Sequence, residues 1–315
     1  MQPFNAATTE AGLSERDSAL RGLDFLWLEL TGKCNLECVH CYADSGPSLP
    51  LSQSMRLADW KRVLAESYSV GCRKVQFIGG EPTIYPHIVE LIQYARLLGY
   101  EFVEVFTNGT AFTEHVREAF RTFHVALAFS VYGDEAYIHD SVTRRAGSLA
   151  KTLGNIKWAL SEGLAVRAAI VETSQNPFKS EATKTFLKEL GVTEVRVDRI
   201  RGVGRGSTGK ESAPSLGELC GSCWEGKLCV TATGDMFPCV FSRSWRVGTV
   251  DEGIKNVVEG NLLMDFRSTL RSRTESETTN STEQCTPPPT PCGPNSPCSP
   301  DYLRRPGCMP RCNPS

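Results

Sequence analysis

The chain has 315 residues, of which 40% are hydrophobic, and its formal net charge at pH 7 is −2. That length allows one large domain or two, and the charge gives no support for nucleic-acid binding through a basic face. The sequence has no run of about 18 apolar residues and no signal peptide at its start, so we expect no membrane span and a cytoplasmic location.

After a lead-in at residues 1–22, apolar strand patterns alternate with helical patterns. Strands are expected at 25–30, 73–78, 102–106, 124–131, 165–171 and 195–200. Helices are expected at 57–68, 86–98, 113–121, 149–161 and 181–190. This alternation predicts a parallel α/β sheet, either an open doubly wound sheet or a partial barrel, which the pattern alone does not separate.

The pattern changes beyond the sixth strand. Gly202-Val-Gly-Arg-Gly206 is not a Walker motif, and Ser207 stands where a dinucleotide fingerprint has its third glycine, so we interpret this stretch as a flexible connection. A β-hairpin is expected around Gly234-Asp235, followed by a short helix at 253–263. The Ser/Thr/Pro-rich segment 271–300 cannot bury enough apolar surface to order itself, although a bound metal cluster would supply ordering energy.

Thirteen cysteines are the unusual feature of the composition. Disulfides are rare in the cytoplasm, and an odd number of thiols argues against a simple disulfide framework, so metal ligation is the leading explanation. Three thiols lie within 34–41, Cys72 is alone, and nine lie between Cys220 and Cys312.

The first group, Cys34-Asn-Leu-Glu-Cys38-Val-His-Cys41, directly follows the first strand. Loops at the carboxyl ends of parallel strands are where α/β proteins build their sites. Structural zinc sites favour two separated ligand pairs, and a ferredoxin run has two residues in both gaps. Three thiolates on a four-iron cluster instead leave one iron open for substrate or cofactor. A zinc loop or a chance spacing is the alternative.

This CxxxCxxC loop resembles the signature of the radical S-adenosylmethionine (SAM) enzymes, and His40 fills the place where that family usually has an aromatic residue. The resemblance implies a (β/α)6 partial TIM barrel over residues 23–201 and a small cysteine-rich auxiliary-cluster domain over 202–315. It also implies two cofactors, a [4Fe-4S] cluster and SAM. The cluster ligands would be Cys34, Cys38 and Cys41.

Further matches follow in family order. Gly79-Gly80-Glu81-Pro82 comes after the second strand, its glycines permit close backbone approach, and the family uses this turn to bind the amino group of SAM. Thr107 and Asn108 end the third strand and Ser130 the fourth, where relatives face the SAM ribose. Arg167 on the fifth strand suits the SAM carboxylate, with a surface ion pair as the alternative.

A possible substrate contact follows Ser130. His139, Asp140 and Arg144 form an HD…R pattern, which in peptide-modifying relatives often lies on a substrate-facing loop. A solvated loop with a local ion pair is the alternative reading of the same residues.

The nine later cysteines resemble a SPASM domain, which holds auxiliary [4Fe-4S] clusters. The stretches 223–229 and 234–239 match the start of that domain, whereas the later thiols depart from its spacing. One auxiliary cluster, or zinc at Cys220-x-x-Cys223, is the alternative to two clusters. The candidate ligands are Cys220, Cys223, Cys229, Cys239, Cys285, Cys292, Cys298, Cys308 and Cys312.

The resemblance implies an enzyme that cleaves SAM reductively to a 5′-deoxyadenosyl radical, which abstracts hydrogen from a substrate. We expect this substrate to be a ribosomally made peptide that is cross-linked or oxidised. We also expect a flavodoxin or ferredoxin as electron donor, with leader-peptide recognition by the barrel, the tail or a separate protein.

Two other hypotheses remain. The first is epimerisation or oxidation of a small molecule, such as an aminosugar in natural-product biosynthesis. Cys72 and Cys220 are nominal hydrogen donors for that reaction, although the position of Cys72 before a strand favours a place in the core. The second is a non-enzymatic zinc-binding or redox-sensing module.

Overall fold

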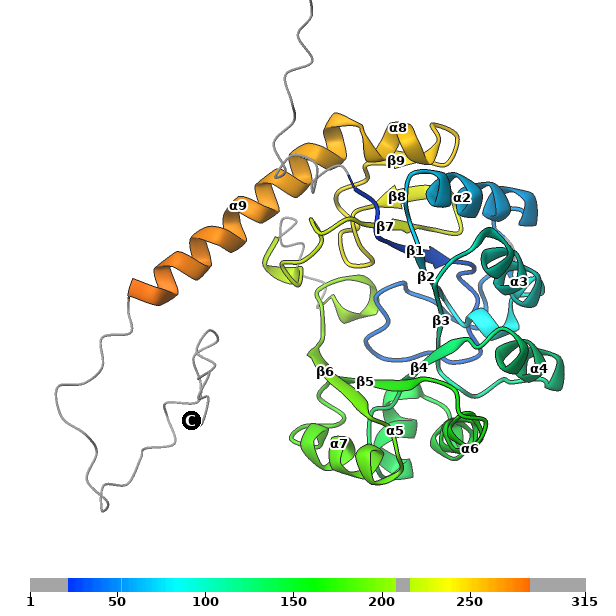
Figure 1. Cartoon of the computed structure of the whole chain (residues 1–315). Helices are drawn as coiled ribbons and strands as arrows, with labels where there is room; N and C mark the ends of the chain where they lie inside the picture. The colour runs from blue at the N-terminus through cyan, green and yellow to red at the C-terminus, as the bar shows by residue number, and fades with distance from the viewer. Residues whose placement is uncertain (1–21, 52, 208–215, 284–315) are drawn as a thin grey trace, which may run out of the picture.

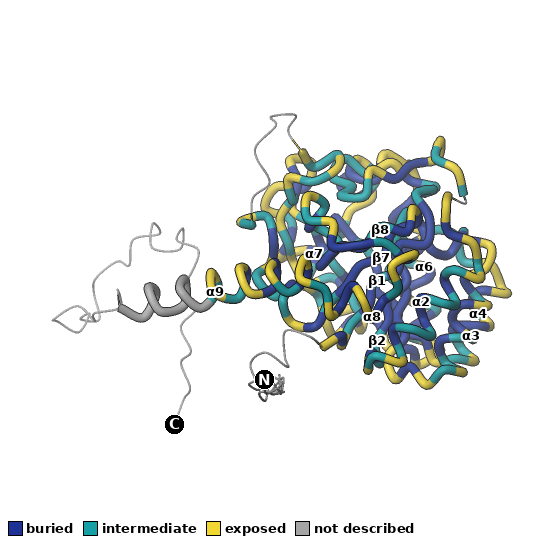
Figure 2. The backbone as a smooth tube through the Cα atoms, turned by 90° about the horizontal axis from the view of Figure 1, so that it is seen from above, coloured by how far each residue is buried: buried dark blue, intermediate teal, exposed yellow. Residues whose placement is uncertain are grey.

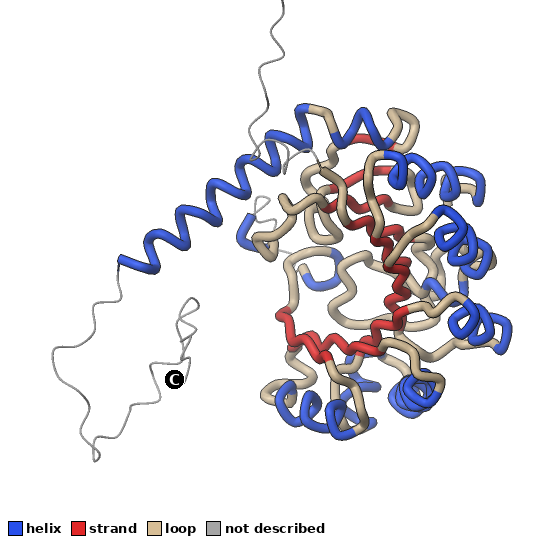
Figure 3. Tube along the Cα trace, viewed as in Figure 1, coloured by secondary structure: helices blue, strands red, loops and turns tan. Residues whose placement is uncertain are grey.

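The computed structural model describes residues 22–51, 53–207 and 216–283, with side chains up to residue 274. In this part of the chain the strands form one sheet in the order β6-β5-β4-β3-β2-β1-β7-β8-β9. The sheet curves, and helices cover its outer face (Figures 1 and 3). The predicted α/β partial barrel with a parallel sheet is confirmed.

The first six strands are parallel and alternate with helices. The strands are β1 (Phe25–Glu29), β2 (Lys74–Ile78), β3 (Phe102–Thr107), β4 (Ala126–Ser130), β5 (Val166–Glu172) and β6 (Glu194–Arg199). The helices are α2 (Leu57–Ser69), α3 (Ile88–Leu98), α4 (Glu114–Thr122), α5 (Ala136–Thr143), α6 (Ser148–Ser161) and α7 (Ser180–Glu189).

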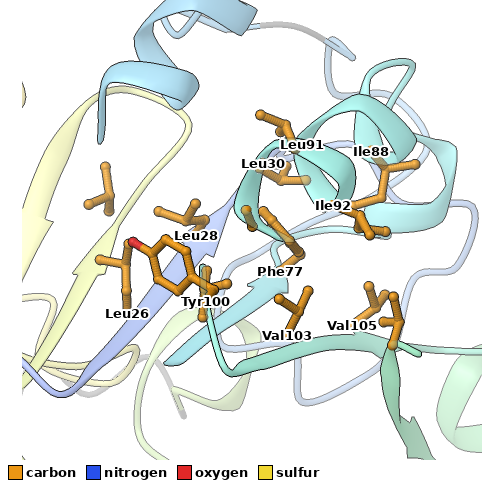
Figure 4. Packing of buried hydrophobic residues seen from close by; sticks show 14 of the residues in the cluster. Leu26, Leu28, Leu30, Phe77, Ile88, Leu91, Ile92, Tyr100, Val103 and Val105 are labelled. Carbon is orange, nitrogen blue, oxygen red and sulfur yellow. The ribbon is translucent and has the colours of Figure 1, made fainter. Parts of the chain in front are cut away.

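Side-chain alternation along β1 explains how this strand serves both the core and the barrel interior. Leu26 and Leu28 are fully buried on the outer face, where they meet the residues of β2, β3 and α3 shown in Figure 4. Trp27 points to the opposite face and lines the interior cavity. Successive strand residues face opposite sides of a sheet, so the same five residues seal the core and shape the cavity wall.

Helix α5 and most of helix α9 (Asn261–Glu283) were not predicted. Helix α5 occupies a stretch that we expected to be a loop, and α9 continues as one helix through residues 271–283, where the composition predicted no order. The first turns of α9 bury Phe266 and Leu270. A packed first turn removes the costly nucleation step, and a helix then satisfies its backbone hydrogen bonds internally. Together α8 (Ile254–Val258) and α9 replace the single helix predicted at 253–263.

The predicted hairpin is present and extends the barrel sheet. Strand β7 (Lys227–Val230) pairs in parallel with β1, and β8 (Asp235–Phe237) pairs antiparallel with β7. The short β9 (Gly248–Thr249) completes the edge. Buried residues are concentrated along β1, β7 and β8 (Figure 2). The region after residue 202 therefore shares a sheet with the barrel.

Some sequence-based expectations lie outside the described residues. These are the lead-in up to residue 21, the thiols from Cys285 onward and the remainder of the Ser/Thr/Pro-rich segment. Within the described residues, no helix is both long and apolar enough to cross a lipid bilayer. Cys72 is fully buried in the main core, as its position before β2 suggested.

Replacing Leu28 with alanine should lower the free energy of unfolding by about 2 to 5 kcal/mol, because the lost side chain leaves a cavity in a close-packed core. Urea titration measures this change. Leu97→Ala is the matched control, because Leu97 is 76% exposed, and it should change the free energy by less than about 0.5 kcal/mol. Equal losses in the two variants would contradict the packing described for β1.

Candidate functional site

A cavity of about 810 Å³ occupies the barrel interior. At the carboxyl ends of the strands it is walled by residues 34–46, here called the thiol loop, and by the turn that follows β2. The ends of β3 and β4 and the inner faces of β5 and β6 complete its wall. Its size falls within the range of about 300 to 1,000 Å³ that is usual for small-molecule sites.

The thiol loop is closed on itself and supported from outside by α5. Lys33 and Gly46 form an isolated bridge across its base, and Cys34 N donates to Gly46 O at 3.1 Å. The loop amides of Glu37 and Val39 donate to carbonyls at the end of α5. The helix that sequence analysis missed is thus the outer support of this loop.

Cys34, Cys38 and Cys41 all line the cavity. Burial, reinforced by the carboxylate of Glu81, raises the pKa of Cys34 to about 12, and burial with the neighbouring Cys41 raises the pKa of Cys38 to about 12. A buried thiolate is stable only beside a compensating cation. The three soft donors on one wall suit an iron–sulfur centre.

No three Cys, His, Asp or Glu side chains in the described ranges converge tightly enough to form a finished metal site. The fit of the thiol loop to a cluster therefore rests on the donor set and its shared cavity. His40 supports this fit. Its ring packs against the edge of Tyr132 at 4.8 Å, and its buried Nδ1 has no hydrogen-bond partner. Burial lowers the pKa of His40 to about 4, so the ring is neutral at pH 7.

The glycine turn after β2 touches the base of the thiol loop. Gly80 N donates to Thr31 O at 2.6 Å, and a Cβ placed on Gly80 would lie 1.9 Å from Lys33 O. Gly79 has a φ of +127°, and a Cβ placed on it would lie 2.7 Å from Thr31 O. Both glycines line the cavity. The two positions require glycine because backbone meets backbone.

Glu81 does not line the cavity. Its carboxylate is fully buried and accepts hydrogen bonds from Thr83 N and Oγ1, from Thr107 Oγ1 at 2.6 Å and from Asn108 N at 2.8 Å. Burial raises its pKa, while these donors counteract part of the shift. Glu81 therefore ties the end of β3 to the glycine turn, and Pro82 begins the short helix η1 (Pro82–Ile84).

Thr107 and Asn108 both lie in the cavity wall. Asn108 Nδ2 donates to Asn35 Oδ1 at 2.8 Å and approaches Cys34 Sγ at 3.7 Å. Ser130, at the end of β4, also lines the cavity. The expected SAM-ribose positions thus share a wall with the first thiol, and Asn35 is a contact that sequence analysis missed.

Arg167 projects into the barrel, where its guanidinium fork is bound by Glu104. The two contacts are 2.7 and 2.8 Å, and Glu104 is only 2% exposed. Gln76 also donates to this carboxylate. The surface ion pair weighed for Arg167 is wrong, because the pair is inside the barrel. One signal could have found it: Glu104 interrupts an otherwise apolar strand.

The HD…R residues lie on α5 rather than on a loop. His139 is buried and accepts a hydrogen bond from Tyr132 N at 3.2 Å, whereas Asp140 caps α6 through Gly147 N and Leu149 N. Arg144 is exposed and ends the helix with a φ of +56°. The cavity wall includes none of His139, Asp140 and Arg144. The solvated-loop alternative is wrong, because these residues lie on a helix and His139 is buried.

Four later thiols lie in the described part of the chain. Cys223 and Cys239 belong to a small second core with Leu219, Phe266 and Leu270, and Cys220 is exposed beside it. A hydrogen bond from Cys223 lowers the pKa of Cys220 to about 5 and also lowers that of Cys239. Three thiols therefore gather at this point.

Cys229 lies apart from these thiols, on β7 opposite Trp27 of β1. Its surroundings include Arg243, which pairs with Glu29 and lies over the rings of Tyr42 and Phe237. This ion pair joins the region after β8 to β1.

The Radical SAM superfamily matches residues 28–173, which carry the thiol loop, the glycine turn and the ends of β3 to β5. These residues therefore resemble a radical SAM domain. SuiB, a solved structure of similar fold, was crystallised with S-adenosylmethionine. This match ends before the later thiols, which begin at Cys220.

Two curated relatives are similar to this chain over somewhat more than half of its length. The chain is 27% identical over 180 residues to the subtilosin biosynthesis protein AlbA of Bacillus subtilis, covering 56% of this chain and 40% of AlbA. It is 32% identical over 190 residues to AdoMet-dependent heme synthase of Methanosarcina barkeri, covering 59% and 53%. The chain thus spans about half the length of the curated relatives that it matches.

A solved structure has the same fold. SuiB of Streptococcus suis, crystallised with its precursor peptide SuiA, superposes with a TM-score of 0.66 at 16% identity, covering 81% of this chain and 69% of SuiB.

Gly80→Ala should displace the thiol loop, because its Cβ would overlap Lys33 O. We expect a lower melting temperature and loss of most of the iron that the wild type takes up on anaerobic reconstitution. Gly154→Ala is the matched control, since Gly154 lies in α6 with no atom within 4 Å of an added Cβ. That variant should keep its iron and gain up to about 1 kcal/mol of stability. Equal iron uptake in both variants would contradict the close contact.

His139 should make stability depend on pH. Burial lowers its pKa from 6.5 to about 4, so the unfolded chain binds more protons between these values. Stability should therefore be complete above about pH 6.5 and fall as the pH decreases toward 4. His139→Gln keeps an acceptor for Tyr132 N but cannot titrate. Urea titrations at pH 7 and pH 5 should show a smaller loss in the variant than in the wild type; parallel losses would rule out this role.

Proposed function

We propose that this protein is a radical SAM maturase that cross-links or oxidises a ribosomally made peptide. The observation that carries this proposal is the single cavity shared by the three motif thiols, the glycine turn and the inner faces of β5 and β6. Its volume of about 810 Å³ accommodates a cofactor together with one substrate side chain, but not a folded partner. AlbA is by name a bacteriocin biosynthesis protein, and SuiB was crystallised with a precursor peptide.

When bound, the cluster and SAM would supply radical chemistry for hydrogen abstraction, with a flavodoxin or ferredoxin as the source of one electron. The protein's own contribution is to hold and orient these groups. Cys34, Cys38 and Cys41 supply the ligands. The backbone of Gly79 and Gly80 offers polar groups to the amino end of SAM.

The remaining wall residues orient the other parts of SAM in this proposal. Thr107, Asn108 and Ser130 present polar groups at the strand ends, and neutral His40 would contribute an aromatic surface for the cofactor. The Glu104 carboxylate holds Arg167 in one orientation, and its guanidinium would supply the positive charge that suits the SAM carboxylate. Such fixed polar groups exclude water and replace it with oriented dipoles.

The later thiols complete the proposal as a SPASM-like auxiliary domain. Cys223 and Cys239 belong to a small apolar core, Cys220 is exposed beside it, and Cys229 lies on β7. These four thiols would share one or two auxiliary [4Fe-4S] clusters with the later cysteines. The auxiliary clusters would accept an electron or bind the peptide. Leader-peptide recognition by a separate protein belongs to the same proposal.

The second candidate is epimerisation or dehydrogenation of a small molecule. The similarity to AdoMet-dependent heme synthase favours it, because at 32% identity a small-molecule enzyme resembles this chain as much as a peptide maturase does. Cys72 is not its hydrogen donor, because that thiol is fully buried in the main core and away from the cavity.

The test uses the reconstituted full chain and the Cys34→Ala/Cys38→Ala/Cys41→Ala variant. At four irons per cluster, we expect about twelve irons in the wild type and about eight in the variant if two auxiliary clusters form. With SAM, a reductant and a candidate precursor peptide, only the wild type should release 5′-deoxyadenosine. Mass spectrometry should show a peptide that has lost two hydrogen atoms.

Other outcomes separate the candidates. One solvent deuterium gained without net oxidation indicates epimerisation. Turnover of a small molecule, with no binding to any candidate peptide, would replace the peptide proposal. Zinc without iron in the wild type would end the radical SAM proposal.

A further inference from the structure

The segment after β6 packs directly on the thiol loop, although sequence analysis interpreted it as a flexible connection. Its short helix η2 (Gly204–Gly206) places the backbone of Gly204 against the loop. Gly204 has a φ of +58°, and a Cβ there would lie 2.4 Å from Cys41 O and 2.5 Å from Tyr42 O. Only glycine allows this approach.

Arg205 makes four polar contacts with the thiol loop. Its backbone N–H donates to Cys41 O at 3.0 Å, and its Nε donates to Cys38 O at 2.8 Å. One terminal nitrogen donates to Ser45 O at 2.6 Å and the other pairs with Asp44 at 3.0 Å. The side chain is 21% exposed. One residue therefore fixes the carbonyls of two of the three thiol-bearing positions.

The same geometry places a permanent positive charge beside the thiols. The guanidinium's only carboxylate partner in the described part of the chain is Asp44, whose side chain is 69% exposed, so water screens that partner strongly. The Arg205 side chain is mostly buried, at 21% exposed, so its charge is less screened than that of its partner. Hydrogen bonds and net charge around a cluster set its reduction potential, and residues behind the ligands commonly change metal affinity by 10- to 100-fold.

We propose that Arg205 is the positioning residue of the thiol loop: its fork fixes the backbone at Cys38 and Cys41 for cluster binding, and its charge raises the reduction potential of the bound cluster. This inference rests on the proposed function for the cluster itself. The contact between the loop and Arg205 does not, because it is present in the protein chain alone.

The experiment compares two variants. Arg205→Met removes the guanidinium hydrogen bonds and the charge, whereas Arg205→Lys removes the guanidinium but keeps the charge. Arg246→Met is the matched control, since Arg246 is 62% exposed and pairs with Asp235 on the hairpin. In the full chain without metal, amide hydrogen exchange at residues 38–46 should be about tenfold or more faster in both Arg205 variants, because hydrogen bonds from a charged group are lost.

After anaerobic reconstitution, iron loss to a chelator should be about 10- to 100-fold faster in both Arg205 variants than in the wild type. The midpoint potential of the SAM-responsive cluster, followed by electron paramagnetic resonance, should fall in Arg205→Met and stay near the wild-type value in Arg205→Lys. The auxiliary clusters in the same sample are the internal reference and should not shift.

Unchanged exchange and unchanged iron loss in Arg205→Met would overturn the positioning role. A potential unchanged in Arg205→Met would overturn the role of the charge, and equal effects of Arg246→Met would show that the changes are not local. If the wild type binds no cluster, the proposed function fails, whereas the exchange experiment still decides whether Arg205 fixes the loop.

Discussion

The site depends on a direct contact between the backbone of Gly80 and that of Lys33 at the base of the thiol loop. An added Cβ on Gly80 would lie 1.9 Å from Lys33 O, so the loop and the glycine turn are in contact with nothing between them. A contact of this kind has no freedom to adjust by changing a rotamer. The position of the first thiol is thereby fixed by the register of β1 against β2, whose residues pair from Phe25 with Lys74 to Glu29 with Ile78.

Glu81 extends this constraint to the third strand. Burying a carboxylate is costly unless hydrogen-bond donors surround it, and here Thr83, Thr107 and Asn108 all donate to it. Removing one donor would leave this buried carboxyl group with fewer of the hydrogen bonds that offset its burial. The glycine turn and the end of β3 are consequently held together. Asn108 connects them to the thiol loop through its hydrogen bond to Asn35.

The sequence predicted the six strands and most helices because each is a local pattern of apolar residues. It also identified the three thiols and the glycine turn, whose spacing is local too. Helix α5 was missed because it is short and two of its four buried residues, His139 and Thr143, are polar, so its apolar pattern is weak. Contacts between distant residues were invisible: Glu104 and Arg167 are 63 positions apart, and Arg205 contacts Cys38 across 167 positions. Such pairs depend on which strands become neighbours, which local patterns do not encode.

The pairing of β1 with β7 has a consequence for how the protein is made. Strand β1 carries the thiol loop, yet one of its two neighbours is Lys227–Val230, about 200 positions later along the chain. During synthesis β1 therefore has an unpaired edge until Lys227–Val230 has left the ribosome. Contacts over such long sequence separations form slowly, and an unpaired strand edge is prone to association with other chains. Nascent chains therefore carry an open edge on β1 until β7 has been made, and a chaperone that covers strand edges would have its largest effect on yield during that period.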